Sequence, residues 1–518
     1  MIIGEVLAPA VRDRPDAPAL VAPAGTLSYA ELDQAAARAA GAWWELGVRP
    51  GDRVGACLQN DLDIAVAYHG AQRIGAIWAG INEAYPAAEQ QAIVDLISPA
   101  VVLAGSRWKA SAGRVIGLPA WRSLLDTAPA APRVAIDPDA PAGIGLTSGT
   151  TGTPKGIVHS HRNLLLPGAV LVATRGWGPS LRKGDCLPLT LLNMQVLTTL
   201  LTAQAGGCCV LTGRRDAEGV AAWIAEHQVT VWNGVPAQLH DLVGRPSPAL
   251  PSLEEVWCGG AALPEELRQA FEAVHRVPVR ATYGLSEAPT VVAIDPVGSH
   301  GQNGAGGQVL PHLEVAAYDP SGQRLAAGQA GELCLAGATT GRWAGAWTPA
   351  LGQWRDGAIA SFDDRAVPPL PFPTGDIGTV SADGWLTVTD RKKLIIVRGG
   401  ANVYPAEVER VIRRHPVVAE VAVFGVPDER LGEKVAALVQ FRDSTDPQAD
   451  LAAVGDLCRA ELARYKVPEA WSAVDAFPLN AMGKIVRTSL AALLAERARL
   501  PTASRRLPRG TLRRRRPW

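Results

Sequence analysis

The strongest constraint on the fold is an alternation of short apolar runs with amphipathic stretches between residues 20 and 390. Helical patterns such as residues 29–46 and 217–227 are followed by β-type runs, which include RVGACL, VVLAG, TVWNGVP and LEEVWCGG. Strands that alternate with helices of about 10–15 residues indicate largely parallel sheets covered by helices. We therefore predict the α/β fold class for this region.

The pattern changes toward the C-terminus. Short alternating strands, LEVAAYD, GELCLAG and GWLTVTD, lie within residues 305–390, and a compact β/α pattern follows TDRKKLIIVRGG. We predict an N-terminal domain over residues 1–392, a small C-terminal domain over 393–495 and a basic tail over 496–518. Residues 505–518 carry seven arginines and no acid. We expect a disordered, solvated end there, although an acidic surface could also bind it.

Charge and cysteine usage argue against several functional classes. Fifty basic and fifty acidic residues give a formal net charge of zero, so no overall field attracts nucleic acid. The N-terminus lacks the basic start and apolar run of a secretory signal. Seven cysteines show no CxxC spacing, which argues against a zinc site and a disulfide framework. We expect reduced thiols and a cytoplasmic location.

One uncharged run, residues 189–211, is long enough to raise the question of a membrane span. It contains amide side chains, four threonines and Gly206-Gly207. We therefore predict a buried helix, a turn and then the strand CCVL instead of a span. Cys208 and Cys209 are expected to be core residues of that strand.

The stretch LTSGTTGTPKGIVHSHRN, residues 146–163, concentrates small and hydroxyl residues around one lysine. Small residues let the backbone approach a polyphosphate, and consecutive amide N–H groups can bind an anion, with Lys155 adding positive charge. The loop is not a Walker sequence, because Lys155 is followed by Gly156. Taken alone, such a loop is a surface turn at least as often as a phosphate site. His159 and His161 have no third ligand nearby, so we predict no metal site there.

Six segments in a fixed order resemble the adenylate-forming superfamily, which includes acyl-CoA and aryl-CoA ligases, luciferase and the adenylation domains of peptide synthetases. The segments are TSGTTGTPKG, GGAALP, TYGLSEA, TGD, DRKKLIIVRGGANVYPAEVE and PLNAMGKIVRTSL. The resemblance extends over about residues 20–490 and is closest to acyl- or aryl-CoA ligases. It implies a large N-terminal region of two α/β subdomains plus a β-barrel, with a small mobile α+β C-terminal domain.

The resemblance also implies a reaction. A carboxylate resists nucleophiles because its charge repels them and oxide is a poor leaving group. Attack of the carboxylate on the α-phosphate of ATP gives an acyl-AMP and pyrophosphate, and coenzyme A can then displace AMP. The site must hold two anions together with preorganised donors and cations. The implied cofactors and partners are ATP, Mg²⁺, coenzyme A and a small carboxylic acid.

The motifs imply a nucleotide site at numbered positions. The β- and γ-phosphates are assigned to the glycine-rich loop: Thr147, Ser148, Gly149, Thr150, Thr151, Gly152 and Lys155. Adenine is assigned to two segments that lie on opposite sides of the base: Gly259, Gly260 and Ala261, and then Tyr283 and Gly284. The ribose hydroxyls are assigned to Asp376 and Arg391.

Three residues are predicted to be catalytic. Glu287 matches the family's Mg²⁺ ligand, and Thr150 lies in the phosphate loop. Lys484 matches the lysine that bridges the carboxylate and the α-phosphate, and the C-terminal domain must close to deliver it. Lys393 matches the family's hinge, at which this domain swings so that Gly399-Gly400 replaces Lys484 for the second step.

Each of these assignments has a structural alternative. Asp376, which follows Thr-Gly, could cap a turn, and Tyr283 could be a core residue. Glu287 could be an exposed acid at a helix start, and Lys484 a solvated lysine in a glycine turn. The shared order of the six segments favours the functional interpretation.

The acid pocket is predicted from an apolar set with a few amide groups: Met194, Gln195, Trp232, Asn233 and Val235. Such a set favours a hydrophobic or aromatic acid. Thr190 and Leu191 stand where the family often has an aromatic residue and a histidine. No aspartate lies in this segment, which argues against an ammonium-binding pocket for α-amino acids.

Coenzyme A is the predicted acceptor because the chain carries no appended carrier domain. Four alternatives stay open: a carrier protein's phosphopantetheine, another nucleophile, ATP-driven activation of a different oxyanion, and a non-catalytic nucleotide-binding relative. The loop GRWAGAWTPALGQWRDG departs from the family's GYW pattern and receives no predicted role.

Overall fold

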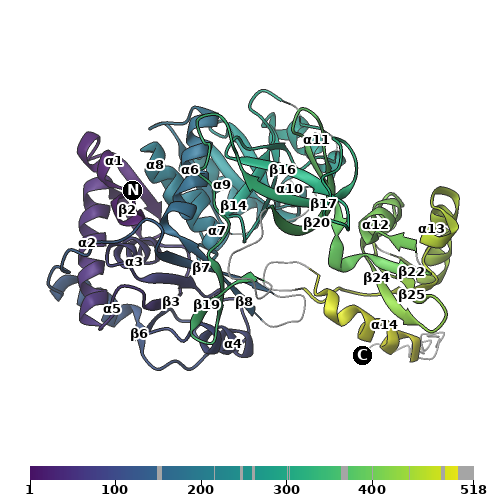
Figure 1. Cartoon of the computed structure of the whole chain (residues 1–518), viewed down its shortest axis with the longest axis horizontal. Helices are drawn as coiled ribbons and strands as arrows, with labels where there is room; N and C mark the ends of the chain where they lie inside the picture. The colour runs from purple at the N-terminus through teal and green to yellow at the C-terminus, as the bar shows by residue number, and fades with distance from the viewer. Residues whose placement is uncertain are drawn as a thin grey trace, which may run out of the picture. The chain divides into compact units, whose positions relative to one another are not determined.

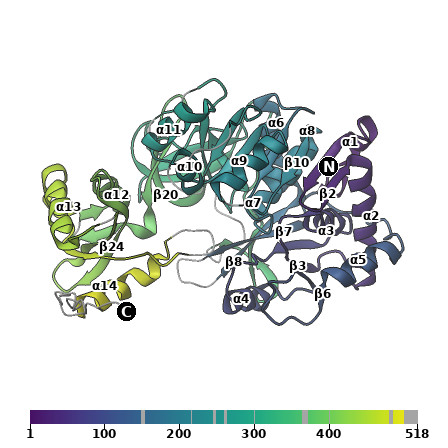
Figure 2. The ribbon, with the colours of Figure 1, turned by 180° about the vertical axis from the view of Figure 1, so that it is seen from behind.

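The computed structural model describes residues 1–148, 154–214, 216–244, 249–259, 263–299, 301–302, 304–362, 371–399, 401–442, 444–479 and 485–499. The chain forms two compact units, Met1–Lys393 and Leu394–Trp518. Figure 1 and Figure 2 show the ribbon from opposite sides. The predicted domain limits, 1–392, 393–495 and 496–518, stay predictions.

An eight-stranded sheet holds both strands that flank the predicted phosphate loop. Its strands lie in the order β19-β18-β8-β7-β4-β3-β5-β6. Their bounds are β3 (Arg53–Cys57), β4 (Ile77–Gly80), β5 (Val101–Ala104), β6 (Val115–Gly117), β7 (Pro141–Ser148), β8 (Pro154–Ser160), β18 (Gly352–Arg355) and β19 (Ala358–Ala360). The strands from β7 to β6 pair in parallel, whereas β8, β18 and β19 are antiparallel. Every residue of β4 and β5 is buried, as expected for parallel strands with both faces covered.

The first helices of the chain belong to the same unit, and both ribbon views place α1 and α2 at one edge of it (Figure 1, Figure 2). They are α1 (Ala8–Asp13), α2 (Tyr29–Glu45), α3 (Leu62–Arg73), α4 (Ala87–Ile97) and α5 (Leu118–Thr127). Helix α2 begins at Ser28, whose Oγ accepts from the Glu31 amide at 3.2 Å while the Glu31 carboxylate accepts from the Ser28 amide at 2.8 Å. This capping box satisfies two backbone donors at the helix start. Trp43 of α2 packs on Trp121 of α5, with ring centroids 4.6 Å apart.

The second large sheet of this unit has nine strands, in the order β15-β14-β13-β12-β11-β9-β10-β1-β2. Its strands are β1 (Pro18–Ala22), β2 (Gly25–Ser28), β9 (Arg182–Asp185), β10 (Cys208–Leu211), β11 (Val231–Gly234), β12 (Glu255–Cys258), β13 (Val279–Leu285), β14 (Thr290–Ile294) and β15 (Gln308–Val309). The strands from β13 to β1 pair in parallel. The accompanying helices are α6 (His161–Arg175), α9 (Ala217–Glu226), α10 (Pro236–Val243) and α11 (Glu265–His275). Two largely parallel sheets with helices confirm the predicted α/β class.

Residues 189–211 form helices and a strand, as predicted. The segment contains α7 (Leu192–Met194), a π-helix over Gln195–Leu200, α8 (Leu201–Ala205) and then β10. Gly206 ends the helix in the left-handed conformation at φ 65°. Cys208 and Cys209 are buried in β10. No helix in the described part of the chain is long and apolar enough to cross a membrane.

A four-stranded antiparallel sheet completes the first unit, in the order β16-β17-β20-β21. Its strands are β16 (Leu313–Tyr318), β17 (Gly331–Gly337), β20 (Phe372–Val380) and β21 (Leu386–Arg391). Closure of this sheet into the expected β-barrel stays a prediction.

The second unit is a small α+β structure with its own apolar core. Its sheet has the order β23-β22-β25-β24, with β26 pairing to β25. The strands are β22 (Ile396–Arg398), β23 (Ala401–Val403), β24 (Val418–Asp428), β25 (Gly432–Phe441) and β26 (Ala470–Ala473), and the helices are α12 (Pro405–Arg413), α13 (Pro447–Glu461) and α14 (Leu490–Arg499). Val408 and Ile412 of α12 are fully buried against this sheet.

Candidate functional site

Three predicted nucleotide-binding residues from three strands meet around one carboxylate. The Tyr283 hydroxyl on β13 donates to Asp376 Oδ2 on β20 at 2.7 Å. Arg391 on β21 lies directly opposite Asp376 in the antiparallel register, and its Nε is 3.0 Å from Asp376 Oδ1. Asp376 is 3% exposed. The sheet therefore presents a buried carboxylate whose two oxygens are oriented by a phenol and a guanidinium.

The protonation of Tyr283 suits this arrangement. Burial, together with the neighbouring Asp376, raises the pKa of the Tyr283 phenol well above its usual range. The phenol therefore stays protonated and acts as a donor toward the carboxylate. Thr374, two residues earlier on β20, holds the backbone of Asp376, because the Thr374 Oγ accepts from the Asp376 amide at 3.0 Å.

Glu287 lies between β13 and β14, half-buried. Burial raises the pKa of its carboxyl, and the positive charges of Arg391 and Lys155 oppose that rise. Within the described ranges, no cationic side chain forms an ion pair with Glu287. A half-buried carboxylate is the kind of oxygen ligand that Mg²⁺ takes in nucleotide sites.

Two glycines of the predicted adenine segments are required by close packing. A Cβ on Gly284 would lie 1.6 Å from the Thr290 carbonyl oxygen, and a Cβ on Gly259 would lie 2.1 Å from Thr282 Oγ. No side chain fits at either position. The packing alone explains both glycines, so their contact with adenine stays a prediction.

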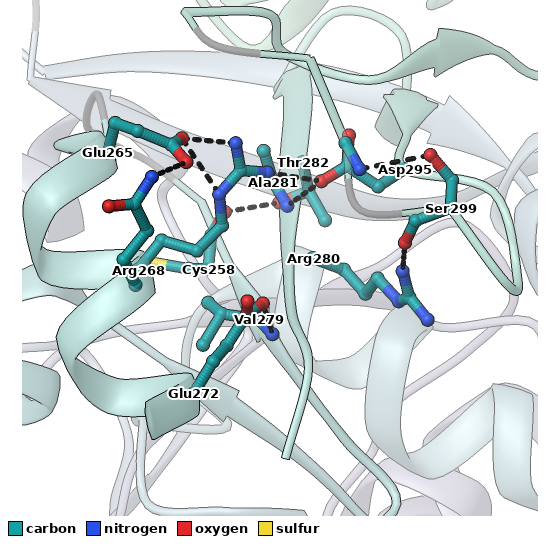
Figure 3. A network of polar contacts seen from close by, with 12 residues as sticks. Cys258, Glu265, Arg268, Glu272, Val279, Arg280, Ala281, Thr282, Asp295 and Ser299 are labelled. Carbon is teal, nitrogen blue, oxygen red and sulfur yellow. Dashed lines mark hydrogen bonds and ion pairs between the residues drawn. The ribbon is translucent and has the colours of Figure 1, made fainter. Parts of the chain in front are cut away.

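A buried polar network holds β12, which ends just before Gly259, and β13, which contains Gly284 (Figure 3). Asp295 Oδ2 accepts from the Ala281 amide at 2.9 Å and from Arg268 Nη1 at 3.4 Å. Glu255 accepts from Arg280 Nε at 3.2 Å, and the Cys258 carbonyl accepts from Thr282 Oγ at 3.3 Å. These contacts fix β12 and β13 just before Gly259 and Tyr283.

The predicted acid pocket contains a buried charge network that sequence reasoning missed. Asn233 Oδ1 accepts from Lys183 Nζ at 2.6 Å, and Asn233 Nδ2 donates to Asp185 Oδ2 at 2.7 Å. Thr198 Oγ donates to the same carboxylate oxygen at 2.7 Å, and Met194 Sδ lies 3.9 Å from Asn233 Nδ2. The Asn233 amide is therefore satisfied within the protein.

The charges of Lys183 and Asp185 each oppose the pKa shift that burial causes in the other side chain. Burial lowers the pKa of Lys183 to about 8 although the nearby Asp185 charge favours the ammonium form. Burial likewise raises the pKa of Asp185, against the opposing effect of Lys183. Lysine is rare in this chain, so Lys-Gly-Asp inside an apolar stretch was an available but unused signal.

The remaining predicted pocket residues do not all share one surface. Trp232 packs with Trp223 and Phe271, whereas the neighbouring Asn233 turns toward Met194. Successive side chains of a strand point to opposite faces, so Trp232 and Asn233 cannot line one pocket. Gln195 is fully buried and donates to the Leu189 carbonyl at 2.9 Å. Val235, half-buried, is the residue at which α10 begins.

Several predicted residues lie outside the described part of the chain: Gly149, Thr150, Thr151, Gly152, Gly260, Ala261, Gly400 and Lys484. The backbones of Thr147 and Ser148 pair with Lys155 and Pro154 across the β7–β8 hairpin. The two residues that flank residues 149–153 of the predicted phosphate loop, Ser148 and Pro154, are therefore paired neighbours in the eight-stranded sheet.

Lys393, the predicted hinge, is the exposed last residue of the first unit. The preceding Lys392 forms an ion pair with Glu332 at 2.6 Å. Gly399 of the second unit has a φ of +56°, a conformation that favours glycine.

His159 and His161 have separate partners and do not form a metal pair. His159 Nε2 is 2.6 Å from the Ser286 carbonyl oxygen, whereas His161 Nδ1 accepts from the Ile3 amide at 3.4 Å. Over the described ranges, no cluster of three His, Cys, Asp or Glu side chains could hold a metal ion.

Two family models match the chain: AMP-binding enzyme over residues 7–342 and AMP-binding enzyme C-terminal domain over residues 407–484. A long-chain-fatty-acid–CoA ligase of Mycobacterium tuberculosis is 31% identical over 490 residues, covering 90% of this chain and 92% of that protein. Feruloyl-CoA synthase of an Amycolatopsis species is 32% identical over 483 residues, covering 89% and 92%. The solved structure of O-succinylbenzoate coenzyme A synthetase from Bacillus subtilis, in complex with ATP and magnesium ion, has a TM-score of 0.79 at 26% identity and covers 94% of this chain and 99% of that one. The chain belongs to the family of AMP-binding enzymes.

Proposed function

We propose that this protein is an AMP-forming ligase that activates a carboxylic acid with ATP and transfers the acyl group to coenzyme A. The relatives reported above are CoA ligases that align over nearly their full length, which supports this activity. The observation that carries the proposal within the structure is the convergence of Tyr283 and Arg391 on Asp376.

The reaction has two balanced steps. In the first, a carboxylate oxygen forms a bond to the α-phosphorus of ATP, and the bridging P–O bond breaks so that pyrophosphate leaves with the electron pair. In the second, the sulfur of coenzyme A bonds to the acyl carbon, AMP leaves as the anion, and the thiol proton passes to solvent.

The described residues suit the holding of AMP through both steps. Asp376 has acceptor capacity for the two ribose hydroxyls, and the contact with Arg391 keeps that carboxylate oriented. Tyr283 offers a ring face for adenine, with its hydroxyl restrained by Asp376. We assign Gly259, Gly260, Ala261 and Gly284 to the same nucleotide as lining residues.

The phosphate chain is assigned to the β7–β8 loop and to Glu287. The loop residues that donate to phosphate oxygens are Thr147, Ser148, Gly149, Thr150, Thr151, Gly152 and Lys155. Glu287 would hold Mg²⁺ together with phosphate oxygens, and the ion would neutralise charge on the pyrophosphate leaving group. Lys155 adds a fixed positive charge at the end of the loop.

Lys484 is proposed to join the site only for the first step. Its ammonium would neutralise the carboxylate and the α-phosphate as they approach each other. The second unit would then turn at Lys393, and the segment Gly399-Gly400 would take its place. One active site could thereby serve two half-reactions.

The substrate is proposed to be a hydrophobic or aromatic acid. Both ends of the buried Asn233 amide are already engaged, by Lys183 and by Asp185, so the amide offers less hydrogen-bonding capacity to a polar substrate. Met194 beside it presents an apolar surface. The fatty-acid and feruloyl specificities named for two relatives agree with such a pocket.

We propose a cytoplasmic location, because ATP and coenzyme A are cytoplasmic co-substrates and the seven cysteines are free thiols. Cell fractionation with an antibody to the chain tests this location. Recovery with the periplasmic or extracellular fraction would contradict it.

Acid-dependent exchange of labelled pyrophosphate into ATP tests the activity. A panel of fatty, aryl and polar carboxylic acids is expected to give exchange with apolar members only, and coenzyme A is expected to convert the same acids to thioesters. Asp376→Asn should lower kcat/KM for ATP by about 10–100-fold, the effect of weakening one or two charged hydrogen bonds. Nucleotide binding without exchange for any acid would identify a non-catalytic relative instead. Thioester formation on a carrier protein but not on coenzyme A would contradict coenzyme A as the acceptor and would identify the carrier protein instead.

A further inference from the structure

The backbone immediately before Glu287 is held by a buried histidine. His159 is 1% exposed, and its Nε2 lies 2.6 Å from the Ser286 carbonyl oxygen. Burial lowers the pKa of His159 to about 4, so the ring is neutral at neutral pH. Because the carbonyl can only accept, the single ring proton must lie on Nε2.

The backbone of Glu287 itself is held from the opposite side. Its carbonyl accepts from the Ala350 amide at 3.2 Å. Asn163 braces the segment that contains Ala350: Asn163 Nδ2 donates to the Pro349 carbonyl at 3.0 Å, and Asn163 Oδ1 accepts from Thr348 Oγ at 2.8 Å. Asn163 is fully buried.

These anchors share an origin in the sequence. His159 is the last but one residue of β8 and Asn163 lies in the first turn of α6, both within ten residues of the predicted phosphate loop. The Leu351 amide also donates to the Val158 carbonyl at 2.8 Å, which ties the tryptophan-rich loop to the same strand. That loop departs from the family pattern, and the contact gives it a structural connection to Glu287.

We propose that His159 and Asn163 are positioning residues that hold Glu287 in the orientation in which its carboxylate meets the divalent cation of the bound nucleotide. This inference rests on the proposed function. The carbonyl before Glu287 is bound by His159, and the carbonyl of Glu287 is bound by the segment that Asn163 holds, so the backbone that carries the metal ligand is fixed to β8 and to the start of α6. Partners that orient a metal ligand in this way typically change metal affinity or activity by about 10–100-fold when they are replaced.

The test uses the full chain with Mn²⁺ in place of Mg²⁺ and a non-hydrolysable ATP analogue. Binding of Mn²⁺ is read by electron paramagnetic resonance, which does not depend on turnover. His159→Leu removes the donor and should weaken Mn²⁺ binding by about 10-fold or more. His159→Gln should restore binding, because the glutamine amide places a donor close to the position of Nε2.

His312→Leu is the matched control. His312 is also 1% exposed, and burial also lowers its pKa to about 4, but it lies outside this cluster. The control should lose stability and keep its Mn²⁺ affinity. Thr348→Val changes an exposed side chain, so the fold should survive, and it should weaken Mn²⁺ binding in the same direction as His159→Leu.

The outcomes separate the two proposals. If the wild-type protein binds no Mn²⁺–nucleotide complex, the proposed function fails and the positioning roles fail with it. If the wild type binds but His159→Leu and Thr348→Val keep its affinity, only the positioning roles are overturned. Equal weakening in His159→Leu, His159→Gln and His312→Leu would also overturn them, since general destabilisation would then explain the loss.

Discussion

At the scale of single residues, Lys183 and Asp185 place opposite charges inside the nine-stranded sheet. The contribution of these two side chains to folding stability depends on the presence of both charges. A single buried charge loses its hydration without gaining an opposite charge in return. Asn233 and Thr198 complete the contacts of Asp185. The four side chains therefore act as one unit in stability.

Removing one charge of this pair should be much worse than removing both. We expect Asp185→Asn to lower the free energy of unfolding by about 3–5 kcal/mol, because Lys183 would stay buried without a carboxylate. Adding Lys183→Met should recover most of that loss. Urea denaturation of both single variants and the double variant measures the coupling, with the exposed Asp126→Asn as control. Additive losses in the double variant would show that the pair is not coupled.

The motifs allowed individual residues of the site to be predicted, but not their contacts. Tyr283, Asp376 and Arg391 come from three separate segments, and only the fold brings the phenol and the guanidinium to one carboxylate. Lys183 and Asp185 were missed because charged residues in a sequence usually indicate a solvated surface. The role of His159 was missed because its partner is a backbone carbonyl 127 residues away.

At the scale of elements, the β13–β14 pair shows how closely backbones approach near the site. Gly284 on β13 faces the Thr290 carbonyl of β14 so closely that even a methyl group has no room. The register also shifts between Tyr283 and Gly284. The position of the Tyr283 ring therefore depends on the absence of a side chain at the next residue.

Gly284→Ala should force these strands apart. We expect a loss of about 1–3 kcal/mol in the free energy of unfolding, typical of overpacking, together with weaker nucleotide binding because Tyr283 would move. Gly178→Ala is the control, since a Cβ there meets nothing within 4 Å. Chemical denaturation and calorimetric titration with AMP measure both effects. Wild-type values for Gly284→Ala would contradict the close approach.

Alternation along strands also bears on the predicted pocket, which stays a prediction. A run such as TVWNGVP indicates a strand, and a strand exposes adjacent residues to opposite faces. The prediction of both Trp232 and Asn233 as pocket walls ignored that rule. The α/β class was predictable from the alternation of helical and strand patterns, and the helix and strand within residues 189–211 were predictable from the amides, threonines and Gly206-Gly207 of that run.

At the scale of the whole molecule, buried neutral histidines make the fold sensitive to acid. Burial lowers the pKa of His69 to about 3 and that of His161 and His312 to about 4, below the value of about 6.5 for an unfolded chain. Between these values the unfolded state binds more protons than the folded state. The contribution of each histidine to the free energy of unfolding is therefore fully present above a pH of about 6.5. It decreases by about 3 kcal/mol for each histidine as the pH falls toward 4.

Thermal denaturation from pH 7 to pH 4.5 tests this linkage. The stability difference between wild type and His312→Leu should narrow as the pH falls, because only the wild type loses stability through that ring. His240→Leu, which changes a histidine with a 71% exposed side chain, is the surface control for the substitution itself. A difference for His312→Leu that is constant with pH would contradict the buried neutral state.

Lys484 tests the proposal that one site serves two half-reactions. Lys484→Ala should abolish adenylate formation, measured by pyrophosphate exchange, and should leave thioester formation from supplied acyl-AMP largely intact. Lys466→Ala, in the same unit and paired with Glu407, should keep both activities. Equal losses of both half-reactions in Lys484→Ala would contradict the proposal that the second unit delivers Lys484 for the first half-reaction only.

The ion pair between Lys392 and Glu332 has a consequence for that motion. It joins Lys392, the residue after β21, to Glu332 of β17 in the same sheet, so a turn that begins at Lys393 would leave this contact in place. A pivot at that point would let the second unit turn while the proposed ribose contacts of Asp376 and Arg391 stay unchanged. AMP would then be retained from one half-reaction to the next, and release of product would depend on a separate event.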